Sequence, residues 1–366
     1  DERVLLREAL VAGRGRVPLD GLRAAVAGRI EAGALLYIKG EIASRDTLAA
    51  ENEFVGWAET QRNLYGALGA APDTGNLGAD QARAVAEILS SASRIVVLQG
   101  DAGTGKTTCL RAVVAGIEKA GGRVFGCAPS AGAADVLRRE LTPDANTLQQ
   151  LLVNQSLQLA THGRVLIVDE AGLISVRQMR DLCRLAYAND NRVLLVGDTK
   201  QHTSVEAGDA LRCLQDYAKV PVAHLTQIRR QKDPAYREAV KQLAAGDAFG
   251  AFNTFARLGA VREIRDEKKL FQAAAGDYVQ AVVAGKSCLA ISPVWKEIHL
   301  FTDEVRGQLK TVGRLAHVER PFATVFSLQW TREQCRRVQD YEAGDALTFH
   351  RAADGFAKGE TVLVSR

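Results

Sequence analysis

The stretch from Gly100 to Thr107 constrains the fold and chemistry of this chain more than any other. It reads as a glycine, four further residues, then Gly105, Lys106 and Thr107, and it stands between a β-branched run and a helix-like segment. Such a strand, turn and helix cradle phosphate groups, because backbone N–H groups turn inward around an anion and the helix directs its positive end there. The pattern predicts a nucleoside triphosphate site in which Lys106 neutralises the outer phosphates and Thr107 offers its hydroxyl to Mg²⁺.

Composition places the chain among globular proteins. Its 366 residues suffice for two or three domains, and 47% of them are hydrophobic and 25% charged. A net charge of +4 is too small to indicate nucleic-acid binding by itself, although a basic groove could be hidden in that average. No apolar run is long enough to span a bilayer and no export signal is visible, so we expect a cytoplasmic protein.

The six cysteines stand singly, without the paired spacing of a zinc site or a disulfide framework. We expect them to be buried thiols in a reducing compartment. The chain opens on Asp1 instead of methionine, and its strand-like run at 360–364 stops almost at the end. Both features suggest a piece truncated from a longer protein.

A coarse reading predicts four regions. Residues 1–76 form a mainly helical N-terminal domain, to which no chemistry can be assigned. Residues 77–224 alternate between strand and helix patterns, which predicts a parallel sheet covered on both faces. The expected strands lie at 94–98, 123–127, 165–168, 192–196 and 220–224, and the expected helices at 106–120, 132–140, 175–188 and 209–217.

The pattern changes in the second half of the chain. Residues 225–315 read as the start of a second α/β domain, with helices at 234–245, 268–284 and 295–311 and a strand at 288–292. Residues 316–366 read as short β runs broken by polar turns. The fold class is therefore α/β, with the mainly helical region before it and a small β-rich region after it.

A second chemical pattern is the apolar run 165–168 followed by Asp169 and Glu170. A strand that ends in two acids places both carboxylates at the carboxyl edge of the sheet, where open α/β sheets bind ligands. Asp169 can then hold Mg²⁺ through water while Glu170 polarises the water that attacks the γ-phosphate. A solvated acidic pair at a strand end is the alternative, and the preceding phosphate loop argues against it.

Two further patterns are weaker alone. The buried run 194–196 ends in Gly-Asp and supplies Gln201, whose amide could sense the γ-phosphate, although Gly-Asp is also an ordinary turn signal. Arg229 and Arg230 follow the last expected strand of the sheet and are candidates for an arginine that reaches the transferring phosphoryl group. A generic basic surface is the alternative for two adjacent arginines.

The ordered stretches GDAGTGKTT, CAPSAGAA, LIVDEAG, LLVGDTKQH and LTQIRRQ resemble the motor motifs of superfamily 1 DNA helicases of the RecD-like branch. Within that branch the chain resembles the helicase region of conjugative relaxase-helicases of the TraI and TrwC type. The resemblance implies a P-loop NTPase with RecA-like parallel sheets. It also implies that residues 316–366 are a truncated, SH3-like small β-barrel insertion.

The resemblance also implies that ATP and Mg²⁺ are the cofactors, and it assigns roles to individual residues. The nucleotide-binding set is Gln81, which would recognise adenine, together with Gly100, Asp101, Ala102, Gly103, Thr104, Gly105, Lys106, Thr107 and Thr108. The catalytic set is Lys106, Thr107, Asp169, Glu170, Gln201 and Arg230, of which Thr107 and Asp169 would hold the metal and Arg230 would be the arginine finger. Single-stranded DNA would contact Pro129, Ser130, Thr147 and His202.

The implied function is a 5′ to 3′ ATP-dependent DNA helicase within a conjugative relaxase, acting on single-stranded DNA and, in the full-length protein, meeting type IV secretion or coupling proteins. A monomer is expected. The chain departs from the pattern in having Asp303 where relatives show asparagine, and two later motor motifs are not found before Arg366. Two alternatives stay open, namely a repair or recombination helicase and a non-motor module that binds single strands or presents a secretion signal.

Overall fold

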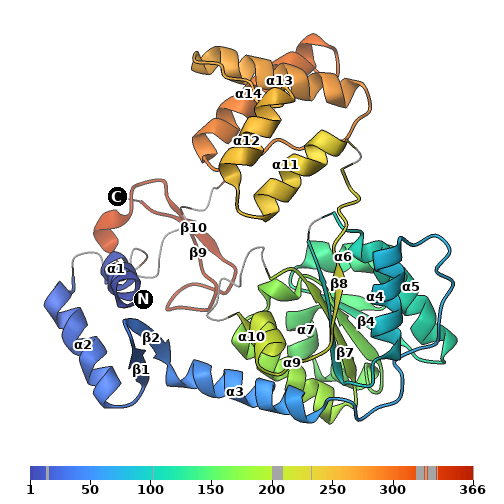
Figure 1. Ribbon diagram of the computed structural model, residues 1–366. Helices are drawn as coiled ribbons and strands as arrows, with labels where there is room; N and C mark the ends of the chain where they lie inside the picture. The colour runs from blue at the N-terminus through green and yellow to red at the C-terminus, as the bar shows by residue number, and fades with distance from the viewer. Residues whose placement is uncertain are drawn as a thin grey trace. The chain divides into compact units, whose positions relative to one another are not determined.

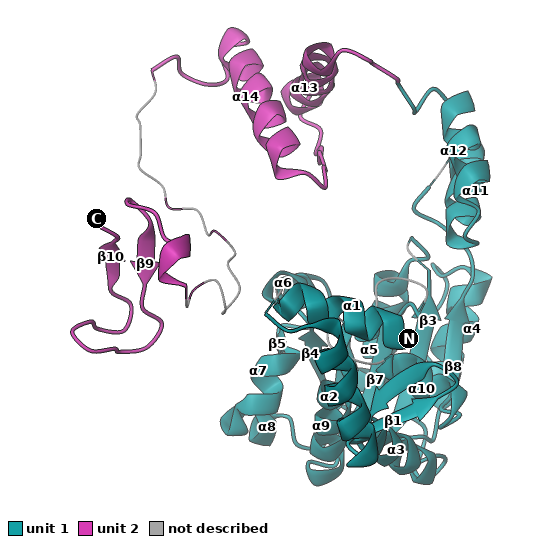
Figure 2. Ribbon diagram, turned by 90° about the vertical axis from the view of Figure 1, so that its left-hand side faces the viewer, with its two compact units in different colours: residues 1–262 teal, residues 263–366 magenta. Residues whose placement is uncertain are grey.

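The computed structural model describes residues 1–13, 16–101, 103–199, 209–231, 233–318, 325, 328, 335 and 337–365. The chain divides into two compact units, Asp1–Arg262 and Glu263–Arg366, which are coloured separately in Figure 2. The first unit contains the phosphate loop and the acidic strand end. None of the helices in the described part of the chain combines the length and apolar character that crossing a bilayer requires.

A six-stranded parallel sheet forms the centre of the first unit (Figure 1). Its strand order is β5-β4-β6-β7-β3-β8. The strands are β3 (Ile95–Gly100), β4 (Val124–Ala128), β5 (Ala145–Thr147), β6 (Val165–Val168), β7 (Arg192–Gly197) and β8 (Val222–Leu225). Five of these confirm strands expected from the sequence, to within two residues at each end. The sixth, β5, is only three residues long and was not expected, because periodicity cannot be read over so short a run.

Helices cover both faces of this sheet because its strands are apolar on both sides. Successive strand residues point to opposite faces, so Ile95 and Val97 join one apolar cluster while Val96 and Leu98 join the other. The first cluster receives α3 (Arg45–Thr60), α7 (Leu148–Val153), α9 (Val176–Ala188) and α10 (Ala210–Asp216). The second receives α4 (Ala79–Ser90) and α5 (Lys106–Lys119).

The N-terminal segment is tied to the sheet through α3. Before it come α1 (Glu2–Gly13), α2 (Leu19–Glu31) and the antiparallel hairpin of β1 (Leu35–Ile38) and β2 (Glu41–Ser44). Helix α3 then buries Ala50, Phe54 and Ala58 in the first apolar cluster, and Phe54 is 0% exposed. Residues 45–60 therefore belong to the core of the first unit.

Short helices complete this unit. The segment between β4 and β6 contains α6 (Ala131–Glu140) and α8 (Gln155–Ala160) besides α7, and a 3-10 turn, η1 (Ala171–Leu173), follows β6. After β8 come α11 (Pro234–Ala244) and α12 (Ala248–Arg257), whose Tyr236 and Phe255 rings meet edge to face. Each begins directly after an aspartate whose side chain accepts a backbone N–H of the first turn.

The second unit contains α13 (Glu267–Val283) and α14 (Trp295–Thr311), which pack through Ala275, Val279 and Val305. It also contains a 3-10 turn, η2 (Val338–Asp340), and an antiparallel pair of β9 (Ala346–Thr348) and β10 (Thr361–Leu363). The expected small β-barrel stays a prediction, since this pair is the only β-ladder among the described residues of that unit.

The expected strand at 288–292 is wrong. Those residues form no ladder in the structure, and Leu289 and Ile291 are 81% and 84% exposed. The alternating apolar pattern is typical of a strand, but a strand also requires a neighbour to accept its backbone hydrogen bonds. The described residues between β8 and α14 provide no such neighbour.

The expectation that all cysteines are buried holds only in part. Cys109, Cys127 and Cys183 are buried on the two faces of the sheet, and Cys213 is half-buried. Cys288 and Cys335 are exposed, which corrects the prediction for these two. Both lie in the second unit, which has a much smaller apolar core than the first.

Candidate functional site

The phosphate loop runs from the end of β3 to the start of α5. Gly103 and Gly105 have φ angles of 80° and 83°, a left-handed conformation that glycine adopts without steric cost. The loop is braced from inside, because the buried Thr104 donates its hydroxyl to the Asp101 carbonyl at 2.9 Å. Lys106 Nζ donates to the Gly100 carbonyl at 2.8 Å. Gly100 and Asp101 therefore fix the loop from the strand side, while Ala102 lies outside the described residues.

Helix α5 begins at this loop with its backbone donors available. Its N-cap residue, Gly105, provides no side-chain acceptor for the N–H groups of the first turn, in which Lys106, Thr107 and Thr108 lie. The N-terminus of a helix attracts anions through these N–H groups and through its dipole. The loop and helix therefore form a site suited to phosphate.

The acidic pair follows β6. Burial raises the pKa of Asp169, while its hydrogen bond from the Glu170 N–H and the charge of Lys106 oppose that shift. Glu170 has φ 51° and ψ 42°, a left-handed conformation that is unusual for a residue with a side chain and costs about 1–3 kcal/mol. Strain of this kind is common at functional sites, where it directs a side chain that a relaxed backbone would point elsewhere.

Strand order brings the loop and the acids to one edge of the sheet. The phosphate loop follows β3 and the acids follow β6, with β7 between them. At the end of β7, Asp198 and Thr199 both contact the Gln99 side-chain amide, at 3.5 and 3.2 Å. The Gly-Asp pattern follows the other two in the chain, but the strand order places it between them in the sheet. Gln201 and His202, which follow it, lie outside the described residues.

The phosphate loop, the acidic pair and the two arginines after β8 line one pocket of about 480 Å³. Of the predicted site residues, it is lined by Gly103, Thr104, Gly105, Lys106, Thr107, Asp169, Glu170 and Arg230, and Arg229 lines it as well. The hydroxyl of Thr107 and the carboxylate of Asp169 are hard oxygen donors of the kind that Mg²⁺ prefers, usually beside substrate phosphates. The pocket thus combines the phosphate loop, hydroxyl and carboxylate oxygens, and three cationic side chains, those of Lys106, Arg229 and Arg230.

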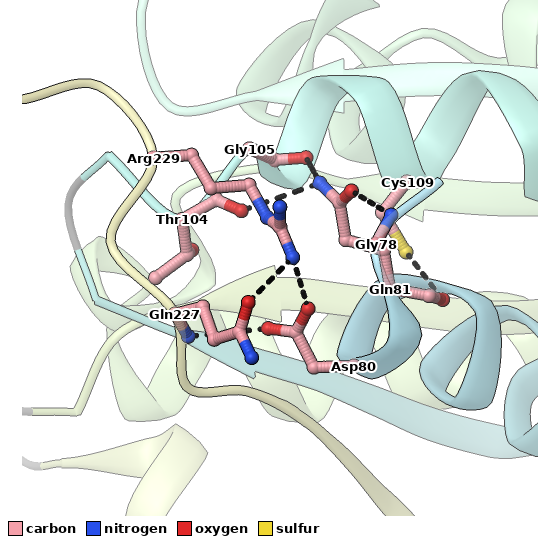
Figure 3. A network of polar contacts seen from close by, with 8 residues as sticks. All are labelled: Gly78, Asp80, Gln81, Thr104, Gly105, Cys109, Gln227 and Arg229. Atoms are coloured by element: carbon pink, nitrogen blue, oxygen red, sulfur yellow. Dashed lines mark hydrogen bonds and ion pairs between the residues drawn. The ribbon is translucent and has the colours of Figure 1, made fainter. Parts of the chain in front are cut away.

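Arg229 and Arg230 reach the pocket from the segment after β8. Their backbone N–H groups both donate to the Gly103 carbonyl, at 2.7 and 3.0 Å. Arg229 also forms an ion pair with Asp80 at 2.5 Å and donates to the Gln227 side chain at 2.8 Å (Figure 3). The guanidinium of Arg230 makes no hydrogen bond or ion pair with another described residue, so it is available to a ligand in the pocket.

Gln81 touches the phosphate loop from the other side. Its side chain is buried, and its Nε2 lies 3.4 and 3.3 Å from the carbonyls of Thr104 and Gly105 (Figure 3). Its Oε1 accepts the Gly78 N–H at 3.1 Å, which closes the first turn of α4. The structure therefore places Gln81 beside the loop, with both ends of its amide engaged by backbone groups.

Of the residues expected to contact a single strand, Pro129, Ser130 and Thr147 lie at the carboxyl ends of β4 and β5. Pro129 and Ser130 are exposed after β4, and Ser130 caps α6 by accepting the Ala133 N–H at 3.2 Å. Thr147 ends β5 opposite Ala128 and caps α7 through the Gln150 N–H at 3.2 Å. The pairing of Ala128 with Thr147 brings these three residues near one another, and β6 and β7 separate β4 from β3, which the phosphate loop follows.

Sequence reasoning missed Asp80. An acidic residue in the first turn of a helix is common, since it complements the helix dipole, so nothing marked this one as special. Its side chain is buried, however, and meets Gln227 and Arg229 nearly 150 residues further along the chain. Only the fold could reveal that contact.

Comparison with known proteins identifies relatives of this region. Residues 76–266 match the family model described as AAA domain. A probable conjugal transfer protein TraA of Sinorhizobium fredii is 28% identical over 236 residues, which cover 64% of this chain and 21% of that protein. The multifunctional conjugation protein TraI of Escherichia coli is 32% identical over 181 residues, 47% of this chain and 10% of TraI.

A third relative comes from a different class of protein. The ATP-dependent RecD2 DNA helicase of Deinococcus radiodurans is 38% identical over 155 residues, 40% of this chain and 21% of that protein. The chain thus spans about a fifth of the length of the TraA and RecD2 relatives. The matched family region contains every residue that lines the pocket, from Gly103 to Arg230, and Gln81 as well.

Proposed function

The chain belongs to the AAA domain family through residues 76–266, and we propose that it is the helicase part of a conjugative relaxase, an ATP-driven motor on single-stranded DNA. One observation supports this most strongly: Lys106, Thr107, Asp169, Glu170 and Arg230 line a single pocket. A protein that only bound nucleotide would not need a water-activating carboxylate and an arginine beside the phosphate loop. Similarity to TraA and TraI supports the conjugative setting.

The phosphate loop would hold ATP by its phosphates. Backbone N–H groups of the loop and the first turn of α5 would surround the β-phosphate, and Lys106 would turn from the Gly100 carbonyl toward the outer phosphates. Mg²⁺ would be held by the Thr107 hydroxyl and, through water, by Asp169; when bound it neutralises charge on the phosphates. Gln81 would recognise adenine at the edge of the loop.

Glu170 would orient and polarise the attacking water, and Arg230 would stabilise charge on the transferring phosphoryl group. Gln201 would couple the nucleotide state to DNA. Residues 77–224 would be the first motor domain and residues 225–315 the start of the second, so that ATP binding closes the cleft between them. Residues 1–76 and 316–366 would be the N-terminal domain and the β-rich insertion.

Single-stranded DNA would contact Pro129, Ser130, Thr147 and His202 through its backbone and bases, independently of sequence, because a motor must move over any sequence. We propose 5′ to 3′ movement by a monomer in the bacterial cytoplasm, with type IV secretion or coupling proteins as partners of the full-length protein. The RecD2 relative favours a second candidate, a repair or recombination helicase without a relaxase. The presence of Lys106, Thr107, Asp169 and Glu170 together in one pocket argues against a non-motor binding module.

ATP hydrolysis by this chain, measured with and without single-stranded DNA, tests the proposal. We expect turnover that single-stranded DNA stimulates and that Lys106→Ala abolishes. Tight DNA binding with no turnover, in this chain and in a longer one, would instead favour the binding module.

A further inference from the structure

The segment after β8 lies directly on the phosphate loop. Two consecutive backbone N–H groups, those of Arg229 and Arg230, share the Gly103 carbonyl as acceptor. The contact is close, because a Cβ on Gly103 would lie 2.9 Å from the Arg230 Cβ. The position of Arg230 at the pocket therefore depends on whatever holds residues 227–230 in place.

Asp80, in the first turn of α4, holds that segment at two points. One carboxylate oxygen accepts the Gln227 N–H at 3.1 Å, and the other pairs with Arg229 at 2.5 Å (Figure 3). The Asp80 side chain is only 5% exposed. Burial raises its pKa, but Arg229 and the Gln227 N–H outweigh burial and keep the pKa below the ordinary value. The carboxylate is therefore charged over the whole neutral range.

The first turn of α4 leaves space for the side chain of Arg229. A Cβ on Gly78 would overlap the guanidinium of Arg229, so a bare backbone is needed at that position. Gln81, the next residue after Asp80, contacts the carbonyls of Thr104 and Gly105. The first turn of α4 thus contacts the phosphate loop through Gln81 and residues 227–230, the arginine segment, through Asp80.

We propose that Asp80 is a positioning residue for the nucleotide site: it fixes residues 227–230 on the phosphate loop and so places Arg230 at the reacting phosphate. The role of Arg230 in this inference rests on the proposed function. The fixing of residues 227–230 by Asp80 does not depend on it. A buried ion pair generally adds little net stability, because desolvating two charges offsets their attraction. The role of this pair is therefore to position the segment 227–230, and a gain in stability does not explain the pair.

The first test is hydrogen exchange of the backbone amides of residues 227–230, which needs no ATP. In the wild-type chain we expect slow exchange at Arg229 and Arg230, and fast exchange there in Asp80→Asn, with β7 amides unchanged. Unchanged protection of Arg229 and Arg230 in this variant would overturn the proposal. This measurement remains decisive even if the chain hydrolyses no ATP, so the positioning claim and the proposed function fail separately.

The second test is a double-mutant cycle on ATP turnover with single-stranded DNA present. Asp80→Asn should lower kcat by about 10²-fold, the cost of a displacement near 1 Å, and change KM little. In the Arg230→Ala background the same substitution should cost nothing more, because the group it positions is gone. Losses that simply multiply would mean that Asp80 acts independently of Arg230, which contradicts the proposal.

A steric variant guards against misfolding of Asp80→Asn. Gly78→Ala leaves every charge in place but pushes the Arg229 guanidinium away, so it should reproduce the exchange and kcat effects. Gly132→Ala, near the start of α6, is the matched control, since a Cβ there would meet nothing within 4 Å. Equal behaviour of the two glycine variants would contradict the proposal.

Discussion

The ammonium of Lys106 donates to the carbonyl of Gly100, 2.8 Å away, so the lysine side chain folds back onto the strand that its own loop follows. This contact holds the charge in the pocket before any nucleotide arrives. Binding would exchange one carbonyl acceptor for phosphate oxygens, which form stronger, charge-assisted hydrogen bonds. Lys106 is therefore expected to contribute to nucleotide binding through that exchange.

Replacing Lys106 by alanine should lower ATP turnover by about 10²-fold or more without unfolding the chain. The lysine supplies the charge that offsets the outer phosphates, and among the described residues its ammonium donates to the Gly100 carbonyl. Steady-state ATPase assays and circular dichroism measure the two effects. Lys119→Ala, at the other end of α5, is the matched control and should keep full turnover; turnover at the parental rate in Lys106→Ala would refute the loop assignment.

Replacing Glu170 by glutamine should preserve ATP binding and reduce hydrolysis by about 10²–10⁴-fold, because the amide cannot polarise the attacking water. Equilibrium binding of labelled ATP, followed by single-turnover hydrolysis, separates the two steps. Glu118→Gln, an exposed change on α5, should alter neither. Loss of nucleotide binding in Glu170→Gln would indicate a structural role for this side chain.

Replacing Gly103 by alanine should lower ATP turnover, because the added Cβ crowds Arg230. Gly103 and Gly121 have φ angles of 80° and 82°, so alanine at either position costs about 1–2 kcal/mol of backbone strain. Only at Gly103 would the new Cβ meet Arg230, at 2.9 Å, while Gly121 has open space around it. We expect similar losses of stability, measured by urea unfolding, but a loss of ATPase activity only in Gly103→Ala. Equal activity in both variants would show that the arginine segment does not need its contact with the loop.

Replacing Phe54 by alanine should lower the free energy of unfolding of the first unit by about 3–5 kcal/mol, because a fully buried ring of α3 is lost from the core. Urea denaturation followed by circular dichroism measures the change. Leu48→Ala on the same helix, where the side chain is 38% exposed, should cost less than about 1 kcal/mol. Equal small effects would mean that α3 does not belong to this core.

Thiol labelling should distinguish the cysteines by burial and by pKa. Burial raises the pKa of Cys109 and Cys127 to about 12 and of Cys213 to about 11, so these thiols stay protonated at pH 8 and react slowly. The exposed Cys288 and Cys335 should react first with iodoacetamide, as mapped by mass spectrometry. Because burial both raises the pKa and shields the sulfur from the reagent, unfolding the chain should make these thiols react as fast as the exposed ones. Rapid labelling of Cys127 at pH 8 would contradict the described core.

The sequence predicted the parts of this molecule that depend on local pattern. Glycines at fixed offsets marked the phosphate loop, and apolar runs ending in charge marked β6 and β7. Parallel strands then had to bring Lys106, Asp169 and Glu170 to one sheet edge, as the shared pocket confirms.

Features that depend on a distant partner could not be predicted. Residues 1–76 were expected to be mainly helical, but nothing in the local pattern indicated that Phe54 of α3 joins the core of the parallel sheet. Asp80 read as an ordinary first-turn acid, since its partner Arg229 lies 149 residues away. The run at 288–292 read as a strand because strand pattern says nothing about whether a neighbouring strand is present.

A crystal structure of this chain with Mg²⁺ and a non-hydrolysable ATP analogue would show whether the pocket beside the phosphate loop binds a triphosphate. We expect the triphosphate on the loop, with Lys106 released from Gly100 onto the outer phosphates and with Asp169 and Glu170 facing the terminal phosphate. An empty pocket at saturating analogue, or an analogue bound elsewhere while Lys106 keeps its bond to Gly100, would contradict this expectation.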